Sequence, residues 1–386
     1  MQMSLRPGCV EFGWGHPAMD LLPVAELRQA AMRTLERTGP QALVYGAAQG
    51  PGRLLELICE RLARIDGRAT ALEQLLITGG VSQALDMICT HCTRPGDIAL
   101  VESPVYHFGL RLLRDRGLEL RPVAADGDGL RVDALEQALE QTWSDGRRAT
   151  LLYTVPTFSN PTGRSLIAER RADLVNVAAR HDLIVLEDDV YRELWFERPP
   201  PPSLAAYGAA NIIRLGSFSK ILAPGLRLGW IIAGEALIRR IAGSGLFTSG
   251  GGVNHLTANI VADYLELGLL DDHVHQLRTA YRQRRDTLMS ELARYLPATC
   301  RFEKPEGGFF VWVELPEGLD SAVLLPRAEV AGVAYLPGER FFTDGGGQRH
   351  LRLAFSLLSD AEMHIGAVRL GDLLHAAART VSEQPR

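Results

Sequence analysis

The chain of 386 residues is long enough for more than one domain, at roughly 150 residues per domain, and it can bury a substantial core. Apolar residues make up 46% and charged residues 23%, the balance of an ordinary globular protein, which argues against long disordered tracts. The 41 basic and 46 acidic side chains give a net charge of −5. With no overall positive field, nucleic acid is not an expected partner.

The sequence also argues against membrane and metal partners. No run of about 18 uncharged apolar residues is present, and the first residues lack the apolar core of a signal peptide, so we expect a cytoplasmic protein without a membrane contact. Five cysteines are an odd number, which favours reduced thiols over a disulfide framework. Cys89 and Cys92 form a C-x-x-C, but no second pair completes a zinc site, so we expect no metal.

Between about residues 45 and 235, short apolar runs alternate with amphipathic stretches, a pattern typical of β-α units that build a mostly parallel sheet. Three stretches between the runs have helical spacing of apolar residues: Ser82–Cys92, Val132–Thr142 and Ile167–His181. The pattern predicts an α/β fold whose large sheet has seven strands, flanked by helices. The predicted strands are Leu75–Thr78, Ile98–Glu102, Leu118–Val123, Thr150–Val155, Leu183–Glu187, Ile212–Leu215 and Leu228–Ala233.

The last third of the chain has a different character. A long helical stretch, about Asn254 to Leu296, leads into a tail with its own predicted strands, Phe309–Glu314, Gly332–Leu336 and Leu351–Phe355. We therefore expect a second, smaller domain.

Lysine is almost absent from the chain. All but two of the 41 basic side chains are arginine, and the exceptions are Lys220 and Lys304. A nucleophilic amine must lose its proton, which arginine does not do because its pKa exceeds 12. Lys220 and Lys304 are therefore the first candidates for covalent chemistry. No cluster of serine and arginine surrounds Lys304, which favours a solvated loop there.

Lys220 follows directly on the predicted strand Ile212–Leu215, and open α/β sheets bind their ligands at the carboxyl ends of strands. Ser217 and Ser219 precede it, and Arg227 lies seven residues further on. An amine beside hydroxyls and a guanidinium suits a phosphorylated aldehyde, because the amine forms an imine while the other groups hold the phosphate.

Two further segments fit the same ligand. Glu187, Asp188 and Asp189 end another predicted strand, where uncompensated carboxylates are costly. One carboxylate paired with a protonated pyridine nitrogen would be compensated, and pyridoxal phosphate needs that partner to act as an electron sink. The segment Thr78-Gly79-Gly80-Val81-Ser82 joins a strand to a helix, an arrangement that offers backbone N–H groups to a phosphate.

Four motifs, in this order and spacing, resemble the fold-type-I aminotransferases of class I/II: the segment Val155–Gly163 with its Asn160-Pro161, Asp188-x-x-Tyr191, Ser217-x-Ser219-Lys220, and Arg227. The branch of 2-aminoadipate and kynurenine aminotransferases, related to the effector domains of MocR-type regulators, is most similar. The resemblance covers about Phe12 to Phe355 and implies pyridoxal 5′-phosphate as cofactor. It also implies a large cofactor-binding domain at residues 45–285 and a small α+β domain built from residues 1–44 and 286–386.

The resemblance implies a role for individual residues. Lys220 corresponds to the Schiff-base lysine and Asp188 to the partner of the pyridine nitrogen, while Tyr191 and Asn160 resemble the donors to the cofactor's ring oxygen. Tyr106 resembles the aromatic residue that stacks on the ring. The remaining cofactor-binding positions match the phosphate site: Gly80, Val81, Ser82, Ser217, Ser219 and Arg227.

The implied substrate-binding residues are Arg352, Gly15, Asn160 and Tyr45. Arg352 resembles the arginine that binds the α-carboxylate bidentately, and Gly15 lies where the family lines the side-chain pocket. Tyr45 resembles the tyrosine that reaches the neighbouring subunit's phosphate, which implies a homodimer with shared active sites. The segment around Gly15 adds aromatic surface but no second arginine, so we expect an uncharged or aromatic side chain on the primary amino donor.

The sequence predicts an aminotransferase that moves an amino group between an L-amino acid and a 2-oxo acid by a ping-pong mechanism. One alternative is an enzyme of the same fold that carries out β-elimination or oxidation in natural-product biosynthesis, because such enzymes keep the same cofactor residues. Another is a MocR-like sensor without its DNA-binding domain. Such regulators carry that domain before the matching region, where this chain has only about ten residues.

Overall fold

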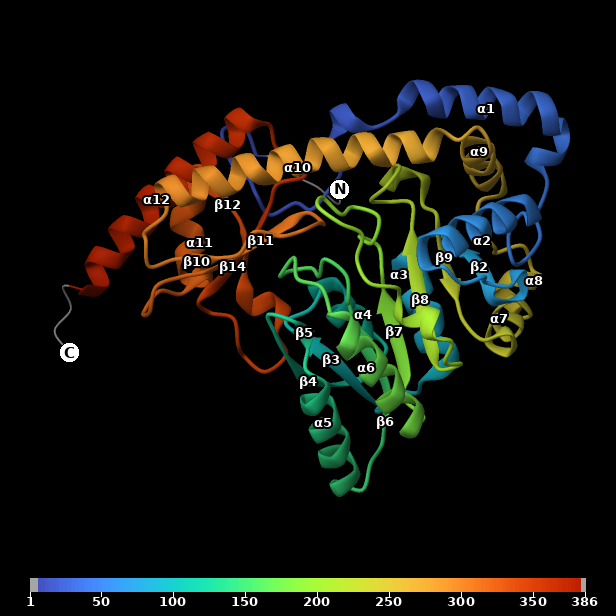
Figure 1. The fold of residues 1–386 in the computed structure, drawn as a ribbon, viewed down its shortest axis with the longest axis horizontal. Helices are drawn as coiled ribbons and strands as arrows, with labels where there is room; N and C mark the ends of the chain where they lie inside the picture. Colours follow the sequence, from blue (N-terminus) through green and yellow to red (C-terminus); the bar gives the residue numbers. More distant parts are fainter. Residues whose placement is uncertain (1–5, 383–386) are drawn as a thin grey trace.

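The computed structural model describes residues 6–382 and consists of a larger and a smaller layered unit lying side by side (Figure 1). The larger unit is built on an eight-stranded sheet with the strand order β2-β9-β8-β7-β6-β3-β4-β5. The predicted α/β class is confirmed. The strands are β2 (Leu75–Thr78), β3 (Ile98–Ser103), β4 (Glu119–Asp126), β5 (Gly129–Leu130), β6 (Ala149–Thr154), β7 (Ile184–Asp188), β8 (Ile212–Ser217) and β9 (Gly229–Ile232).

All seven predicted strands of this sheet are present, and the eighth, β5, is a correction to the predicted number. It has two residues and pairs antiparallel with β4. A strand this short shows no alternation of apolar residues in the sequence. Strands β4, β3, β6, β7 and β8 run parallel to one another, whereas β9 is antiparallel to both β8 and β2. The sheet is therefore mixed and mostly parallel.

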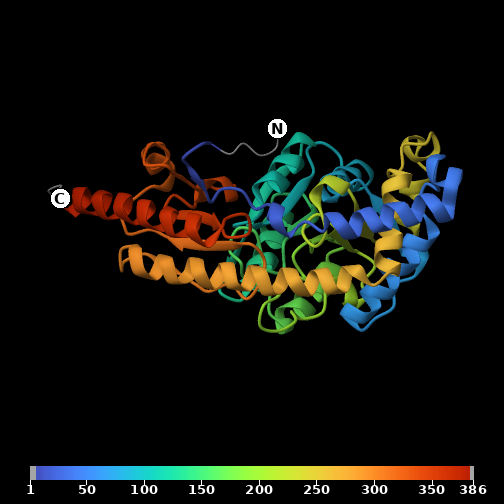
Figure 2. The same ribbon diagram turned by 90° about the horizontal axis from the view of Figure 1, so that it is seen from above.

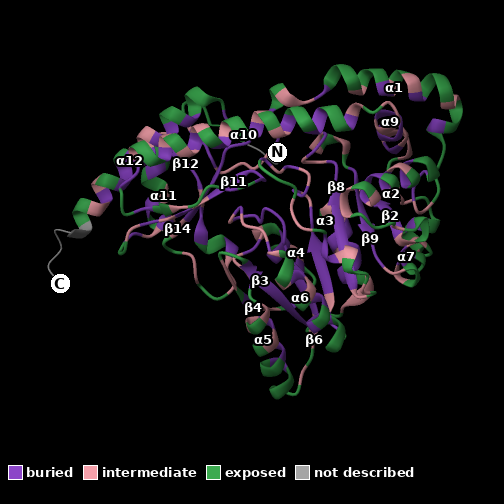
Figure 3. Ribbon diagram, in the orientation of Figure 1, coloured by how far each residue is buried: buried purple, intermediate pink, exposed green. Residues whose placement is uncertain are grey.

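Helices cover both faces of this sheet, which explains why its central strands are mostly apolar. Helices α3 (Val81–Cys92), α4 (His107–Asp115) and α7 (Glu235–Ala242) share one apolar core with the strands. Helices α5 (Val132–Ser144) and α6 (Ala168–Arg180) share another on the opposite face. Figure 3 shows the strands buried and the outer faces of the helices exposed.

The smaller unit holds an antiparallel sheet in the order β10 (Arg301–Phe302), β11 (Phe310–Glu314), β14 (His350–Ala354) and β13 (Leu336–Pro337). Strand β1 (Val10–Glu11) pairs in parallel with β12 (Val333–Ala334), so the start of the chain joins this unit. Its helices are α11 (Ser321–Val330), α12 (Asp360–Ser382) and part of α10 (Leu269–Tyr295), and Figure 2 shows α10 and α12 side by side.

The remaining helices, α1 (Val24–Thr38), α2 (Gly52–Asp66), α8 (Gly245–Thr248) and α9 (His255–Glu266), lie at the far end of the larger unit (Figure 1). The single helical stretch expected from about residue 254 to 296 is in fact two helices. Gly268, with φ +74, ends α9 and redirects the chain into α10.

The predicted domain limits at 44/45 and 285/286 stay predictions. The second limit falls inside α10, which runs continuously from the larger unit to the smaller one. None of the helices within residues 6–382 is long and apolar enough to cross a membrane.

Candidate active site

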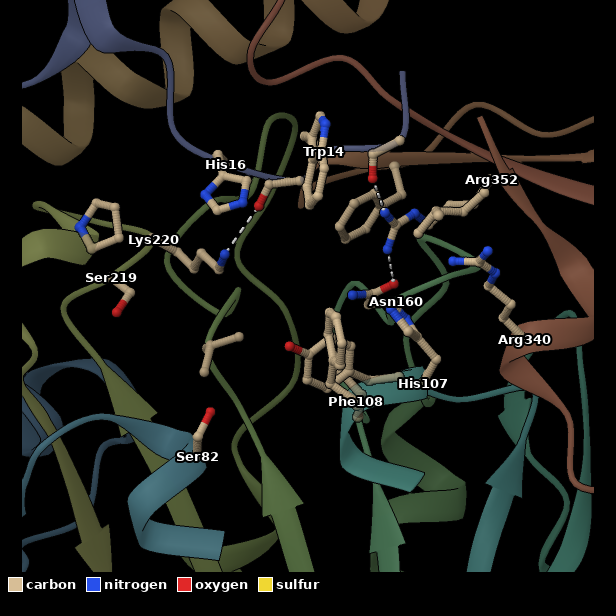
Figure 4. Close-up of a pocket in the computed structure, with 18 of the residues that line it drawn as sticks. Trp14, His16, Ser82, His107, Phe108, Asn160, Ser219, Lys220, Arg340 and Arg352 are labelled. Carbon is tan, nitrogen blue, oxygen red and sulfur yellow. Dashed lines mark hydrogen bonds between the residues drawn. The ribbon is translucent and has the colours of Figure 1, made fainter. Parts of the chain in front are cut away.

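A cavity of about 820 Å³ opens between the edge of the large sheet and the small unit (Figure 4). Twelve of the fourteen site residues predicted from sequence line it, and only Tyr45 and Gly80 do not. The twelve are Gly15, Val81, Ser82, Tyr106, Asn160, Asp188, Tyr191, Ser217, Ser219, Lys220, Arg227 and Arg352.

The strand register explains why segments far apart in sequence meet at this edge. Strands β3, β6, β7 and β8 are parallel, so the residues that follow them emerge side by side. Gly229 of the antiparallel strand β9 pairs with Ser217 on one side and with Thr78 on the other. The lysine segment after β8 and the glycine segment after β2 are thereby brought together.

Lys220 lies in the turn that follows β8. The Ser217 hydroxyl accepts a hydrogen bond from the Ser219 N–H at 3.0 Å, which fixes this turn. From it, the Lys220 ammonium crosses the cavity and donates to the Gly15 carbonyl at 3.0 Å (Figure 4). Burial, followed by the positive charges of Arg352 and Arg227, lowers the pKa of Lys220 to about 8. About a tenth of the amine is therefore neutral and nucleophilic at pH 7.

Three consecutive carboxylates end β7, and the two-residue period of a strand separates their roles. Glu187 points to one face, where its carboxylate accepts hydrogen bonds from the backbone of Leu204 and Ala205. Asp189 lies on that same face, where Arg192 and Arg214 pair with it at 2.5 and 2.9 Å. Asp188, between them, lines the cavity. Of the three carboxylates, Asp188 is the one that lines the cavity, and it is also the one that the spacing to Tyr191 predicts.

The Asp188 carboxylate has one oxygen bound and one oxygen free. Tyr153, fully buried on β6, donates its hydroxyl to Oδ2 at 2.8 Å, whereas the buried Oδ1 has no hydrogen-bond partner among the described residues. Burial raises the pKa of Asp188 to about 6, the Tyr153 hydrogen bond opposes that rise, and Asp189 adds to it. An unpartnered buried carboxylate oxygen fits a cationic N–H, such as that of a protonated pyridine.

The glycine segment forms a phosphate-sized cradle at the start of α3. Gly80 has φ +99, a conformation that favours glycine, and a Cβ at this position would lie 2.7 Å from the Arg227 guanidinium and displace it. Arg227 donates to the Gly79 carbonyl at 2.9 Å. Val81 and Ser82, which begin α3, line the same cavity as Arg227, and the free N–H groups of a helix start together with a guanidinium are suited to a phosphate. These features fit the phosphate end of the predicted cofactor.

Arg352 projects from β14 of the small sheet into the same cavity. Its guanidinium donates to Asn160 Oδ1 at 2.8 Å and to the Gly13 carbonyl at 2.6 Å, and its Cζ lies 4.2 Å from the centre of the Phe310 ring (Figure 4). Burial lowers its pKa to about 10, which leaves it cationic at neutral pH. A fixed, planar cation of this kind suits a carboxylate.

The aromatic wall of the cavity comes from the loop after β3. Tyr106 immediately precedes α4, and burial raises the pKa of its phenol to about 12, so the phenol stays neutral. His107 packs against Phe108 and Phe341 with ring centroids 4.1 and 5.1 Å apart. Burial, with the charges of Arg352 and Arg340, lowers the pKa of His107 to about 3, so this imidazole is neutral.

Two of the predicted site residues lie outside this cavity, and one arginine that was not predicted lines it. Tyr45 is 87% exposed and lies beside Gly250, outside the cavity of its own chain. Gly80 lies beneath Arg227 and does not line the cavity. The segment around Gly15 contributes no arginine to the cavity, as expected, but Arg340 lines it from another part of the chain.

Some residues of the site were missed by sequence reasoning. Tyr153 has the pattern of a core strand residue, and its partner Asp188 is 35 positions away on the neighbouring strand. His107 adjoins the predicted Tyr106, so that position could have been found. Arg340 belongs to a single-turn helix, Gly338–Phe341, and no local pattern distinguishes it from the other arginines.

A lysine of lowered pKa lies at the carboxyl edge of the parallel strands. A glycine segment suited to a phosphate lies on one side of it, and an unpartnered carboxylate lies on the other. With the order of the strands, this arrangement defines the chain as a transferase of fold type I. The family described as aminotransferase class I and II matches residues 7–370. The chain belongs to this family and is an aminotransferase.

Relatives in this family share both sequence and fold with the chain. It is 34% identical to aromatic-amino-acid aminotransferase 1 of Thermococcus litoralis, over 95% of this chain and 88% of that protein. It is also 34% identical to the 2-aminoadipate transaminase of Thermus thermophilus, over 97% and 92%. A structure of the kynurenine aminotransferase of Pyrococcus horikoshii in complex with PMP aligns with a TM-score of 0.91 at 33% identity, over 96% and 91%.

Transcriptional regulators are also homologous to the chain. The HTH-type regulator YisV of Bacillus subtilis is 29% identical over 95% of this chain and 73% of the regulator.

Proposed function

We propose that the chain binds pyridoxal 5′-phosphate on Lys220 and exchanges an amino group between an L-amino acid and a 2-oxo acid in two half-reactions. The observation that carries this proposal is the buried, unpartnered Oδ1 of Asp188, a residue that lines the same cavity as Lys220. When bound, the cofactor supplies an aldehyde for the amino group and a ring that accepts the electron pair released at the substrate Cα.

Each residue has a part in this proposal. Asp188 accepts the N–H of the pyridine ring through Oδ1, while Arg227 and the start of α3 hold the phosphate. Arg352 binds the substrate α-carboxylate and thereby orients Cα towards Lys220. The Lys220 amine, with its pKa near 8, then moves the proton from Cα. Tyr191 and Asn160 line the same cavity and would donate to the ring oxygen.

The proposed assembly is a homodimer in which each subunit completes the other's site. Large apolar side chains are exposed on the segment after α1 and on α8, where Leu43, Val44, Tyr45 and Leu246 are 54–87% exposed. A cluster of this kind supports contact with a second copy. Tyr45 would then reach the phosphate of the partner's cofactor rather than that of its own chain.

The test of the proposed activity is product analysis with a panel of amino acids, with and without 2-oxoglutarate. We expect a 2-oxo acid that accumulates stoichiometrically with glutamate and only when the acceptor is present. Ammonia release without acceptor would indicate β-elimination, and consumption of oxygen would indicate oxidation. Cofactor binding without turnover of any amino acid would favour a sensor. A sensor is the second candidate function because the chain is homologous to regulators such as YisV.

A further inference from the structure

Arg171 of α6 is fully buried on the side of the large sheet to which Glu187 points, opposite to Asp188. Its Nη1 lies 3.9 Å from the Glu187 carboxylate and donates to the Pro202 carbonyl at 3.3 Å. Burial lowers the pKa of Arg171 to about 10, which leaves the side chain cationic at neutral pH. A buried cation is costly unless hydrogen bonds satisfy its N–H groups, so the partners of this guanidinium show what it holds.

The other bonds of Arg171 converge on the two ends of one loop, residues 156–166. Nη2 donates to the Pro156 carbonyl at 2.7 Å and to the Thr157 hydroxyl at 3.1 Å. Nε donates to the Leu166 carbonyl at 2.9 Å, and the Leu166 N–H donates to the Pro156 carbonyl at 2.9 Å. The guanidinium therefore fixes the closed base of this loop from outside the cavity.

The same loop carries Asn160 into the cavity. Inside the loop the Ser159 N–H donates to the Arg164 carbonyl at 2.7 Å, and the Gly163 N–H donates to the Ser159 carbonyl at 2.6 Å. Asn160 lies within this turn, is 4% exposed and accepts the hydrogen bond from Arg352 at 2.8 Å. Because these internal bonds make the loop a compact unit, a displacement of its base displaces Asn160 as well.

We propose that Arg171 is a positioning residue of the site, which sets the place of Asn160 by holding both ends of the loop from behind the sheet. The inference rests on the proposed function, in which Asn160 donates to the ring oxygen of the cofactor. A donor at this oxygen stabilises its negative charge and so lowers the pKa of the imine that joins the cofactor to Lys220. Displacement of Asn160 should therefore raise that pKa, although Arg171 touches neither cofactor nor substrate.

The first test follows the loop in the apoprotein. Arg171→Lys keeps a positive charge beside Glu187 but lacks the planar fork that reaches both ends of the loop. We expect hydrogen exchange of the amides within residues 156–166 to accelerate about tenfold. Arg170→Lys is the matched control, because it makes the same replacement at the adjacent position of α6, where the arginine pairs with Asp126 at 2.6 Å. Its exchange in this loop should follow wild type.

The second test follows the holoenzyme through the pH titration of the absorbance of the bound cofactor. We expect Arg171→Lys to raise the apparent pKa by about one unit, a tenfold change in proton affinity, and Arg170→Lys to leave it unchanged. Thr157→Val removes one acceptor of Arg171 and leaves the buried charge in place, so it should give a smaller rise even if Arg171→Lys does not fold. Asn160→Ala should also raise the pKa, and adding Arg171→Lys or Thr157→Val to it should raise the pKa no further.

A role confined to stability gives a different result. Arg171→Lys would then lower Tm while the cofactor titrates as in wild type, and this outcome would overturn the inference. Equal rises with and without the Asn160 side chain, or unchanged exchange of the loop, would overturn it too. Failure of the wild type to bind pyridoxal phosphate would instead overturn the proposed function, and the exchange measurement, which needs no cofactor, keeps the two failures apart.

Discussion

Replacing Tyr153 with phenylalanine removes a single hydroxyl from the site and leaves the ring in place. The ring occupies space that Gly109 of α4 leaves open, since a Cβ there would lie 2.6 Å from Tyr153 Cε1. The phenylalanine ring packs in the same space without creating a large cavity. The change therefore isolates the 2.8 Å hydrogen bond to Asp188 Oδ2.

The expected size of the effect follows from that bond. Hydrogen bonds to charged groups contribute about 1.5–3 kcal/mol, and one pKa unit corresponds to about 1.4 kcal/mol. Loss of the bond should raise the pKa of Asp188, already about 6 in the protein without cofactor, by about one to two units. At pH 7 the carboxyl would then be half or mostly protonated, and a protonated carboxyl is a poor partner for a pyridinium N–H. We expect the dissociation constant of pyridoxal phosphate to rise about tenfold at pH 7 and to recover as the pH is raised.

The assay is equilibrium binding of pyridoxal phosphate to the apoprotein between pH 6 and 9. Tyr264→Phe is the matched control, because it also removes a buried hydroxyl, one on α9 that has no hydrogen-bond partner among the described residues. Its binding curve should follow wild type at every pH. The reasoning fails if Tyr153→Phe binds the cofactor like wild type across this range, or if both variants lose affinity equally and without pH dependence.

Two further predictions concern the lysine and the assembly. Because burial and two arginines lower the pKa of Lys220 to about 8, attachment of pyridoxal phosphate to the apoprotein should accelerate with rising pH up to about 8 and level off above it. Borohydride should then fix the adduct on Lys220, and peptide mapping that finds it on Lys304 would contradict the assignment. For the dimer, subunit exchange between inactive Tyr45→Phe and Lys220→Ala proteins should restore part of the activity, because one site of each mixed dimer is then intact. Verified exchange without recovery would exclude shared sites.

The fold was largely predictable because each helix and strand has its own pattern of apolar residues in the sequence. Buried parallel strands such as β6 are mostly apolar, and amphipathic stretches such as α6 lie between the strands, so both patterns are visible in the sequence. Such reasoning fails where the backbone conformation of a single residue decides where a helix ends. The positive φ of Gly268, which divides the predicted long helix, is one example.

The site was predictable where several residues lie in one motif, as with Asp188 and Lys220. It was not predictable where a side chain acts across the fold. The role of Tyr153 depends on which residue faces it on the next strand. The place of Arg340 in the cavity depends on how the small unit packs against the large one, 120 positions after Lys220 in the chain. Neither relation leaves a periodic pattern in the sequence.

Helix α10 is a rigid connection between the two halves of the site. Its 27 residues span about 40 Å at the usual helical rise, from the neighbourhood of α9 in the larger unit to α12 in the smaller one. The larger unit carries Lys220 and Asp188, whereas the smaller one carries Arg352. Because no loop interrupts the helix, the small sheet cannot move against the large one without tilting or bending this rod. Any change in the distance between Arg352 and Lys220 that comes from movement of the two units therefore requires this helix to tilt or bend.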